Sequence, residues 1–114
     1  MVAVMPLTQE DLESWLREQA GPLLVAFYSR YCLVCQRMQP VTAELADGLS
    51  GCLATVKVDV TDYPDLAARY GIRTVPTLVL FTQGRSQVLA EGVFSRKAVE
   101  EKVRLGLGLK EVAL

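Results

Sequence analysis

Two cysteines, Cys32 and Cys35, lie three residues apart between an apolar run and a segment with helical periodicity. Side chains at this spacing on a helix lie roughly 5 to 6 Å apart, which is within the range that a disulfide requires. A reversible disulfide between the two sulfurs is therefore geometrically permitted. The alternative is that both cysteines are inert thiols of the core, since buried cysteine is common.

The residue types in the chain exclude several kinds of catalytic and metal site. It has 114 residues, with three cysteines and no histidine. Without histidine, Cys-His nucleophilic catalysis and histidine-containing zinc sites are excluded. A zinc site made of thiolates alone needs about four of them, so no metal is expected. Cys52, in a turn after Gly51, is interpreted as a loop thiol, with a regulatory or intermolecular role as the alternative.

The two close cysteines are expected to differ in role. Cys32 lies where a strand ends and a helix begins, and the free N–H groups and dipole of a helix N-terminus stabilise a thiolate there. Cys35 lies one turn further, on the apolar side of the same helix. It can attack only after Cys32 has formed a mixed disulfide beside it. Cys32 is therefore predicted to be the nucleophile and Cys35 the resolving thiol.

The composition predicts a single domain that spans residues 1–114. Apolar residues make up 51% of the chain, and 12 basic residues are scattered among 13 acidic ones, a balance that argues against nucleic-acid binding. The start MVAVMPLTQEDLE lacks the features of a signal peptide. No stretch approaches the roughly 20 apolar residues of a membrane span. We therefore expect a cytoplasmic monomer that does not bind membranes.

Helical and strand patterns alternate along the chain and predict an α/β fold with a central mixed sheet of four to five strands, flanked by helices on both faces. The last two strands are close enough in sequence to form an antiparallel hairpin. The expected elements are an optional edge strand at Val2–Val4 that Pro6 limits, a helix from Thr8 to about Ala20, strand Leu23–Tyr28, a helix from the cysteines to Gly48 or Gly51, strand Leu53–Val60, a short helix from Pro64 to Gly71, strands Thr77–Phe81 and Ser86–Glu91, and a helix capped by Ser95.

This succession of motifs closely resembles the thioredoxin family. The matching segments span roughly residues 7–103 and include LLVAFYSRYC, the CLVC pair, the proline of QRMQP, VKVDV, ARYGIRTVPTLVLF and the glycine of EGVFS. The resemblance implies a thioredoxin fold with a disulfide-exchange site at Cys32 and Cys35. It also implies a cis peptide bond before Pro76. Finally, it implies one helix running through Pro40, where the rules for proline alone would begin a helix.

The resemblance further implies an activity and its partners. Protein disulfides would be reduced through a reversible Cys32–Cys35 disulfide, without a bound cofactor or metal, and a thioredoxin reductase would restore the dithiol. An apolar surface around Cys32 would receive the substrate. Pro76 is the supporting residue of this predicted site, and the substrate-binding residues carried over from the family are Tyr31, Leu33, Val34, Val75, Gly92 and Val93.

The chain departs from the family pattern in ways that bear on activity. Leu33 and Val34 replace the usual Gly-Pro between the cysteines. Ala26 replaces a buried acid that is thought to exchange a proton with the second cysteine, which predicts a slower reductase and a lower pKa of Cys35. The same departure favours an alternative, a binding or partner-dedicated module with a slow or idle CxxC. Lys57 is interpreted as a strand lysine whose charged end reaches solvent, with a place near the thiols as the alternative, and it is left out of the predicted site.

Overall fold

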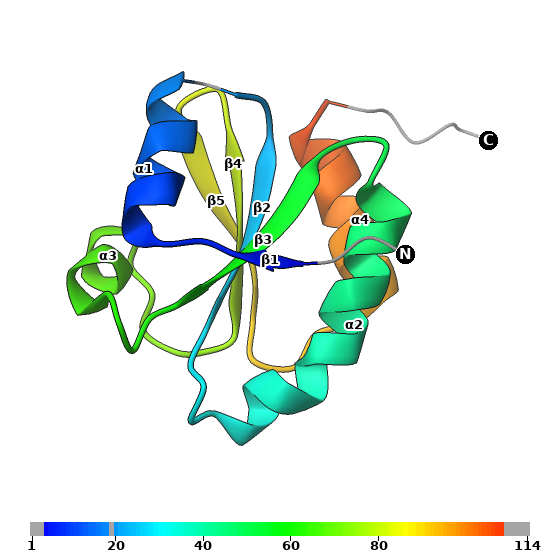
Figure 1. Cartoon of the computed structure of the whole chain (residues 1–114). Coiled ribbons are helices and arrows are strands. Elements are labelled where there is room, and N and C mark those ends of the chain that lie inside the picture. The colour runs from blue at the N-terminus through cyan, green and yellow to red at the C-terminus, as the bar shows by residue number, and fades with distance from the viewer. Residues whose placement is uncertain (1–3, 19, 109–114) are drawn as a thin grey trace.

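The computed structural model describes residues 4–18 and 20–108, and its helices and strands alternate as the sequence predicts (Figure 1). The first half of the chain contributes three strands and two helices, and the second half two of each. In chain order the elements are β1 (Met5–Pro6), α1 (Gln9–Glu18), β2 (Leu23–Tyr28), α2 (Leu33–Leu49), β3 (Ala54–Asp59), α3 (Pro64–Arg69), β4 (Thr77–Thr82), β5 (Arg85–Glu91) and α4 (Arg96–Gly106).

The strands form one mixed five-stranded sheet in the order β1-β3-β2-β4-β5. Strands β1, β3 and β2 run parallel, while β4 runs antiparallel to both β2 and β5. The crossover from β2 to β3 passes through α2, and the β4–β5 hairpin turns at Gln83 and Gly84, both with positive φ. The predicted mixed sheet with its terminal hairpin is confirmed.

Helices cover both faces of the sheet, with α1 and α3 on one side and α2 and α4 on the other (Figure 1). Strand β2 is central, and its side chains alternate between two cores. Leu23, Val25 and Phe27 belong to one core, whereas Leu24 and Ala26 belong to the other, which also contains buried residues of α2 and α4. Position 26 therefore lies on the face of the sheet that α2 covers.

The helix starts follow from capping side chains. The Asp11 N–H donates to Thr8 Oγ1 (3.0 Å) and the Thr8 N–H donates to the Asp11 carboxylate (3.3 Å), so the first helix begins with a reciprocal capping pair. Ser95 Oγ caps α4 by accepting from the Ala98 N–H. Helix α2 contains Pro40 in its interior, as the family resemblance implied.

The edge strand lies further along the chain than expected. The sequence predicts it at Val2–Val4, but Val4 lies outside any strand and residues 2 and 3 lie outside the described residues. The observed strand is Met5–Pro6, paired with Val56 and Lys57. Pro6 is tolerated there because an edge strand needs ladder hydrogen bonds on one side only.

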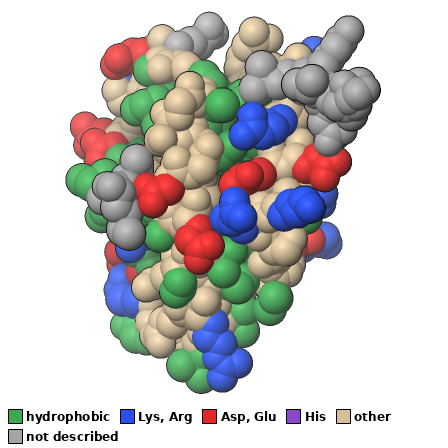
Figure 2. Space-filling view, turned by 90° about the vertical axis from the view of Figure 1, so that its right-hand side faces the viewer, with side chains coloured by type: hydrophobic (Ala, Val, Ile, Leu, Met, Phe, Trp, Pro, Cys, Tyr) green, Lys and Arg blue, Asp and Glu red, His purple; other side chains and the backbone are tan. Residues whose placement is uncertain are grey.

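The outer face of α2 and α4 carries charges of both signs (Figure 2). Arg96 on α4 pairs with Glu44 on α2 (3.7 Å) and with Glu100 on its own helix (2.8 Å). Within residues 4–18 and 20–108, no helix combines the length and apolar character needed to cross a membrane.

Candidate active site

Cys32 occupies the N-cap of α2, directly after the loop that follows β2. Its Sγ accepts a hydrogen bond from the Cys35 N–H (3.1 Å) and donates to the Val75 carbonyl (3.7 Å). The side chain is half-buried, so a substrate can reach it. The Sγ therefore lies at the N-terminus of α2, where free backbone N–H groups and the positive end of the helix dipole meet.

Cys35 lies one turn further on the inner side of α2 and is only 4% exposed. The pKa of its thiol is raised to about 11, first by burial and then by the hydrogen bond and charge of the neighbouring Cys32. All three cysteines are free thiols in the structure. The geometry therefore separates an accessible sulfur at the helix cap from a protonated, shielded one behind it.

The loop before β4 brings Pro76 to the site. The Val75–Pro76 peptide bond is cis, which confirms the expectation from the family resemblance. The Gly92 N–H donates to the Pro76 carbonyl (2.8 Å), which ties the loop after β5 to the one before β4. Gly92 has φ +76°, and a Cβ there would meet no atom within 4 Å, so backbone conformation rather than crowding requires the glycine.

The predicted substrate-binding residues lie on loops and on the first turn of α2. Tyr31, Leu33 and Val93 are large apolar side chains that are 76%, 69% and 76% exposed. Val34 is also exposed, and Val75 is half-buried beside Cys32. Large exposed apolar side chains that gather at one place are typical of an interaction surface.

An ion-pair cluster that sequence reasoning missed supports the loop before Cys32. Arg30 bonds Asp59 at the end of β3 (2.9 Å) and Asp62 (3.0 Å), and its guanidinium lies over the Tyr31 ring at 5.2 Å. Burial acts to raise the pKa of Asp59, but hydrogen bonds from Thr61 and Arg30 outweigh it, and the pKa is lowered. The alternation along this strand predicts that the Asp59 side chain faces solvent. In the structure Asp59 is buried and holds Arg30 in place.

Lys57 was left out of the predicted site, and only the alternative interpretation placed it near the thiols. The interpretation as a surface lysine outside the site does not fit the structure, because Lys57 lines a cavity of about 280 Å³ together with Ala26, Cys35 and Pro76. Its Cα is the register partner of Ala26 in the parallel β2–β3 pair. The signal in the sequence was the alternation of β3, which places Lys57 opposite Val56 and Val58 and hence away from the core under α1.

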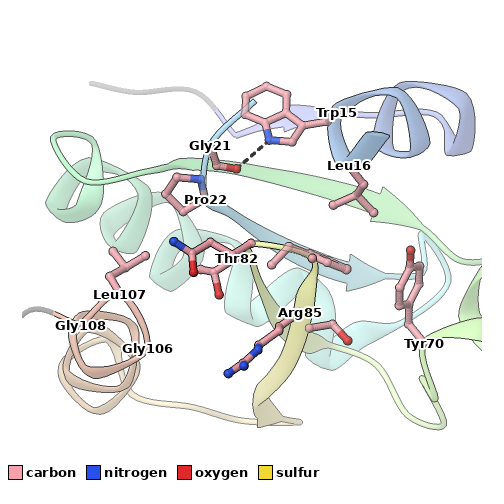
Figure 3. Close-up of a pocket in the computed structure, with 14 residues that line it drawn as sticks. Trp15, Leu16, Gly21, Pro22, Tyr70, Thr82, Arg85, Gly106, Leu107 and Gly108 are labelled. Carbon is pink, nitrogen blue, oxygen red and sulfur yellow. Dashed lines mark hydrogen bonds between the residues drawn. The ribbon is translucent and has the colours of Figure 1, made fainter. Parts of the chain in front are cut away.

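A larger cavity, of about 700 Å³, lies at the other end of the sheet (Figure 3). Gly21 and Pro22 line it just before β2 begins, whereas Cys32 follows the end of the same strand. The Trp15 indole N–H donates to the Gly21 carbonyl there (3.1 Å). Among the described residues no cysteine lines this cavity, so it is remote from the thiol chemistry. In the described part of the chain, no three Cys, Asp or Glu side chains cluster as a metal site.

Comparison with known proteins places these features in one family. A family model described as Thioredoxin matches residues 3–104. "Thioredoxin Y2, chloroplastic" from Arabidopsis thaliana is 33% identical over 104 residues, which cover 91% of this chain and 62% of that protein. The chain thus spans about three fifths of the length of this relative. "Thioredoxin C-2" from Corynebacterium nephridii is 34% identical over 90 residues, or 79% of this chain and 82% of that protein.

A solved structure gives the same result for the fold. The crystal structure of chloroplastic thioredoxin z, described as defining a novel type-specific target recognition, superimposes with a TM-score of 0.80. The match covers 96% of this chain and 98% of the other, at 23% sequence identity. The arrangement of sheet and helices in the described residues is therefore that of a known fold.

Proposed function

Because the chain belongs to the thioredoxin family, we propose that it is a thiol-disulfide oxidoreductase that reduces protein disulfides. Cys32 attacks a target disulfide and forms a mixed disulfide, and Cys35 then resolves it by forming the Cys32–Cys35 disulfide. The observation that supports this order is the asymmetry of the two sulfurs. Cys32 is an accessible N-cap that accepts the Cys35 N–H, whereas Cys35 is 4% exposed.

The proposal includes partners of defined chemistry. The substrates are exposed disulfides of other proteins, and a thioredoxin reductase returns the Cys32–Cys35 disulfide to the dithiol. No bound cofactor takes part, because both electrons are carried by the two sulfurs. The cytoplasmic location and the monomeric state that the sequence led us to expect remain predictions.

A direct experiment tests the activity. Thiols are trapped with a maleimide before and after reduction, and turnover of a model protein disulfide is then followed with excess dithiol. The proposal requires that two thiols are lost on oxidation and that the disulfide substrate is reduced catalytically. An oxidised protein that retains all three maleimide-reactive thiols under denaturing conditions would contradict it.

One observation favours a second function. Ala26 stands where the family carries a buried acid, so the CLVC pair of a dedicated binding module could resolve slowly or not at all. In that case the protein would bind its partner equally well with Cys35 replaced by serine. The turnover experiment above distinguishes the two functions, since a binding module gives no catalytic reduction.

Charging the apolar surface around Cys32 is expected to weaken the use of protein substrates. An extended target backbone can pair with the chain beside Val75, which gives affinity through main-chain hydrogen bonds. Val75→Asp and Val93→Asp should each raise KM for a protein disulfide roughly tenfold, which corresponds to about 1.4 kcal/mol of binding. Initial rates against substrate concentration measure this change.

A matched control separates this surface from a general effect of charge. Leu105→Asp introduces the same carboxylate at a residue that is 60% exposed in the last turn of α4, away from the loops around Cys32. Its KM should equal that of the unmodified protein. If Val75→Asp and Val93→Asp also leave KM unchanged, the substrate does not dock on this surface.

A further inference from the structure

The cavity of about 700 Å³ lies at the end of the sheet remote from the cysteines, and the proposed disulfide exchange does not use it. Its volume falls within the range of roughly 300 to 1,000 Å³ that is typical of sites for small organic ligands. Figure 3 shows Trp15 and Leu16 of α1 on one side of it, Tyr70 at one end and residues 106–108 at the other. The walls of the cavity therefore come from helices on both faces of the sheet.

Apolar and aromatic side chains line a large part of this cavity. They are Trp15, Leu16, Pro22, Tyr70, Phe81 and Leu107. Phe81 is buried, and the Tyr70 ring meets it edge-on, with the ring centres 5.1 Å apart. The Trp15 indole N–H donates to the Gly21 carbonyl (3.1 Å), which restricts rotation of the indole. These rings form a largely preformed surface, and a flat apolar ligand can bind it without a large cost for ordering the protein.

Arg85 is the only charged residue among the fourteen described residues that line the cavity. Its side chain forms no ion pair within residues 4–18 and 20–108. A guanidinium group donates two parallel hydrogen bonds to the two oxygens of a carboxylate. The charge of the cavity wall therefore complements a ligand that carries a carboxylate group.

Further hydrogen-bonding groups lie beside Arg85 on the β4–β5 hairpin. Thr82 is the last residue of β4 and Ser86 the second residue of β5, and both line the cavity. Gln83 and Gly84 form the turn between them, with φ values of 47° and 77°. Such a turn favours asparagine, aspartate or glycine at its first position. The turn geometry does not account for the longer amide side chain of Gln83, which also lines the cavity.

The surroundings of the cavity favour a ligand with one negative charge rather than several. Gly106 is the last residue of α4, and residues 106–108 line one end of the cavity. The C-terminal end of a helix carries a partial negative charge that repels anions. With one cation and a helix C-terminus on its wall, the cavity is poorly suited to a nucleotide or another polyphosphate. The single anionic group is expected to lie against Arg85.

We propose that this cavity binds a small organic anion in which a flat apolar body carries one carboxylate group. The apolar body lies against Trp15 and Tyr70. The carboxylate pairs with Arg85 and accepts hydrogen bonds from the β4–β5 hairpin. This site is separate from the proposed disulfide exchange, because Cys32 follows the opposite end of β2 from the one that Pro22 precedes.

A pair of isosteric probes tests the site on the full chain. The ¹⁵N-labelled protein is titrated with 2-naphthoate and with 2-naphthamide, which has the same shape and no charge, and binding is followed by ¹H–¹⁵N NMR. Trp15 is the only tryptophan of the chain, so its indole N–H signal is unambiguous. 2-Naphthoate should shift this signal and the amide signals of Leu16, Gly21 and Ser86 saturably, with Kd of roughly 1 mM or lower. 2-Naphthamide should bind roughly tenfold more weakly, because it lacks the charge that pairs with Arg85.

Two variants distinguish the charge of Arg85 from a change in the shape of the cavity. Arg85→Gln should weaken binding of 2-naphthoate roughly tenfold and leave that of 2-naphthamide within about twofold. Unchanged 2-naphthamide binding shows that the apolar part of the cavity is intact in this variant. Arg37→Gln removes an exposed charge from α2, outside the cavity, and should change the binding of neither probe.

Several results would overturn the proposal. One is a Trp15 indole signal that does not move at about 10 mM 2-naphthoate. Others are equal affinity for the two probes, or an Arg85→Gln variant that binds 2-naphthoate unchanged or loses both probes alike. Shifts confined to the loops around Cys32, such as those of Leu33 and Val93, would place the probe on the surface around the cysteines instead. Cavity signals that move with protein concentration, without any probe, would assign the cavity to a second copy of the chain.

Discussion

In a Cys52→Ser background, the Cys32→Ser variant is expected to lose disulfide exchange. The Cys35→Ser variant is expected to attack its target and then to remain as the mixed disulfide between Cys32 and that target. The hydroxyl of serine does not replace a thiolate in attack on a disulfide, so exchange should fall by at least about 10³-fold in Cys32→Ser. Cys35 cannot substitute for it, because it is 4% exposed and burial raises its pKa to about 11. The order of the two sulfurs is thus set by access and by protonation together.

The complex trapped by the Cys35→Ser variant identifies the attacking cysteine directly. Without the resolving thiol, the bond between Cys32 and the target should persist until dithiothreitol is added. Mass spectrometry of the complex after proteolysis identifies the cysteine that carries the target. A target attached to Cys35 in Cys32→Ser would contradict the assigned roles.

The third thiol provides the control. Cys52 is half-buried against the core under α2 and α4, and its replacement by serine alone should leave trapping and turnover unchanged. A target attached to Cys52 in the protein with all three cysteines would show that the loop thiol takes part in exchange.

The chemistry of the two cysteines could be predicted because it depends on local sequence. The apolar run of β2 followed at once by the periodic pattern of α2 places Cys32 at a helix N-cap. A stripe begins at Cys35 and continues at successive steps of three or four residues through Met38, Thr42, Leu45 and Leu49, and all of its members except Met38 are buried. The buried side of a helix and its first residue both depend on neighbouring residues in the sequence, so both can be predicted from it.

Two features around the cysteines, the place of Lys57 and the Arg30–Asp59 ion pair, depend on contacts between distant segments, and the predicted site did not include them. Alternation along β3 shows that Lys57 and Val56 face opposite sides, but it does not show which helix covers which side. That follows only from the β2–β3 register, in which Lys57 is paired with Ala26. The bond between Arg30 and Asp59 joins residues that are 29 positions apart, and a solvent-facing acid has the same sequence pattern as a buried paired one.

The predicted position of the two-residue edge strand was wrong for a different reason. Alternation needs about four residues to be recognised, and β1 consists of Met5 and Pro6 only. Its place is fixed by pairing with Val56 and Lys57 rather than by its own residues. An apolar run such as Val2–Val4 is therefore a poor guide to where an edge strand begins.

Introducing the missing acid by Ala26→Asp is expected to accelerate resolution at neutral pH. A carboxylate beside Cys35 can accept its proton, and general-base catalysis contributes about 10²- to 10⁴-fold. The acid also faces Lys57, its register partner, and a cation there favours the ionised carboxylate that accepts the proton. Resolution is measured by mixing the reduced protein, in a Cys52→Ser background, with excess 5,5′-dithiobis(2-nitrobenzoate): the second, concentration-independent release of thionitrobenzoate reports attack by Cys35 on the mixed disulfide. This second phase should be at least about tenfold faster in Ala26→Asp.

Ala26→Asp should change the reduction potential only slightly, although it changes the rate of resolution strongly. The sequence suggested that loss of the acid lowers the pKa of Cys35, with one pKa unit corresponding to roughly 30 mV. In the structure burial nevertheless raises this pKa to about 11, so Cys35 of the dithiol is protonated near neutral pH. A carboxylate that raises the pKa further alters the neutral dithiol little. We expect Ala26→Asp to be more reducing by less than about 30 mV, measured against glutathione.

Ala26→Asn is the matched control, because it adds a side chain of similar shape that cannot accept the proton. Both variants place a polar group in a position that is 6% exposed, and each should lower the free energy of unfolding by about 1 to 3 kcal/mol. Only the aspartate should speed resolution. If Ala26→Asp and Ala26→Asn resolve at the same rate as the unmodified protein, the proton of Cys35 does not pass position 26.

Combining Ala26→Asp with Lys57→Met shows how the acid and the cation depend on each other. In the single variant the introduced carboxylate has a cation to pair with, whereas in the double variant it is buried without a partner, which costs more stability. The carboxylate then has a raised pKa and exists partly in its neutral form, which accepts no proton. The double variant should resolve more slowly than Ala26→Asp alone and unfold at lower denaturant concentration. Simple additivity of the two substitutions, in both rate and stability, would mean that residues 26 and 57 do not interact across the cavity.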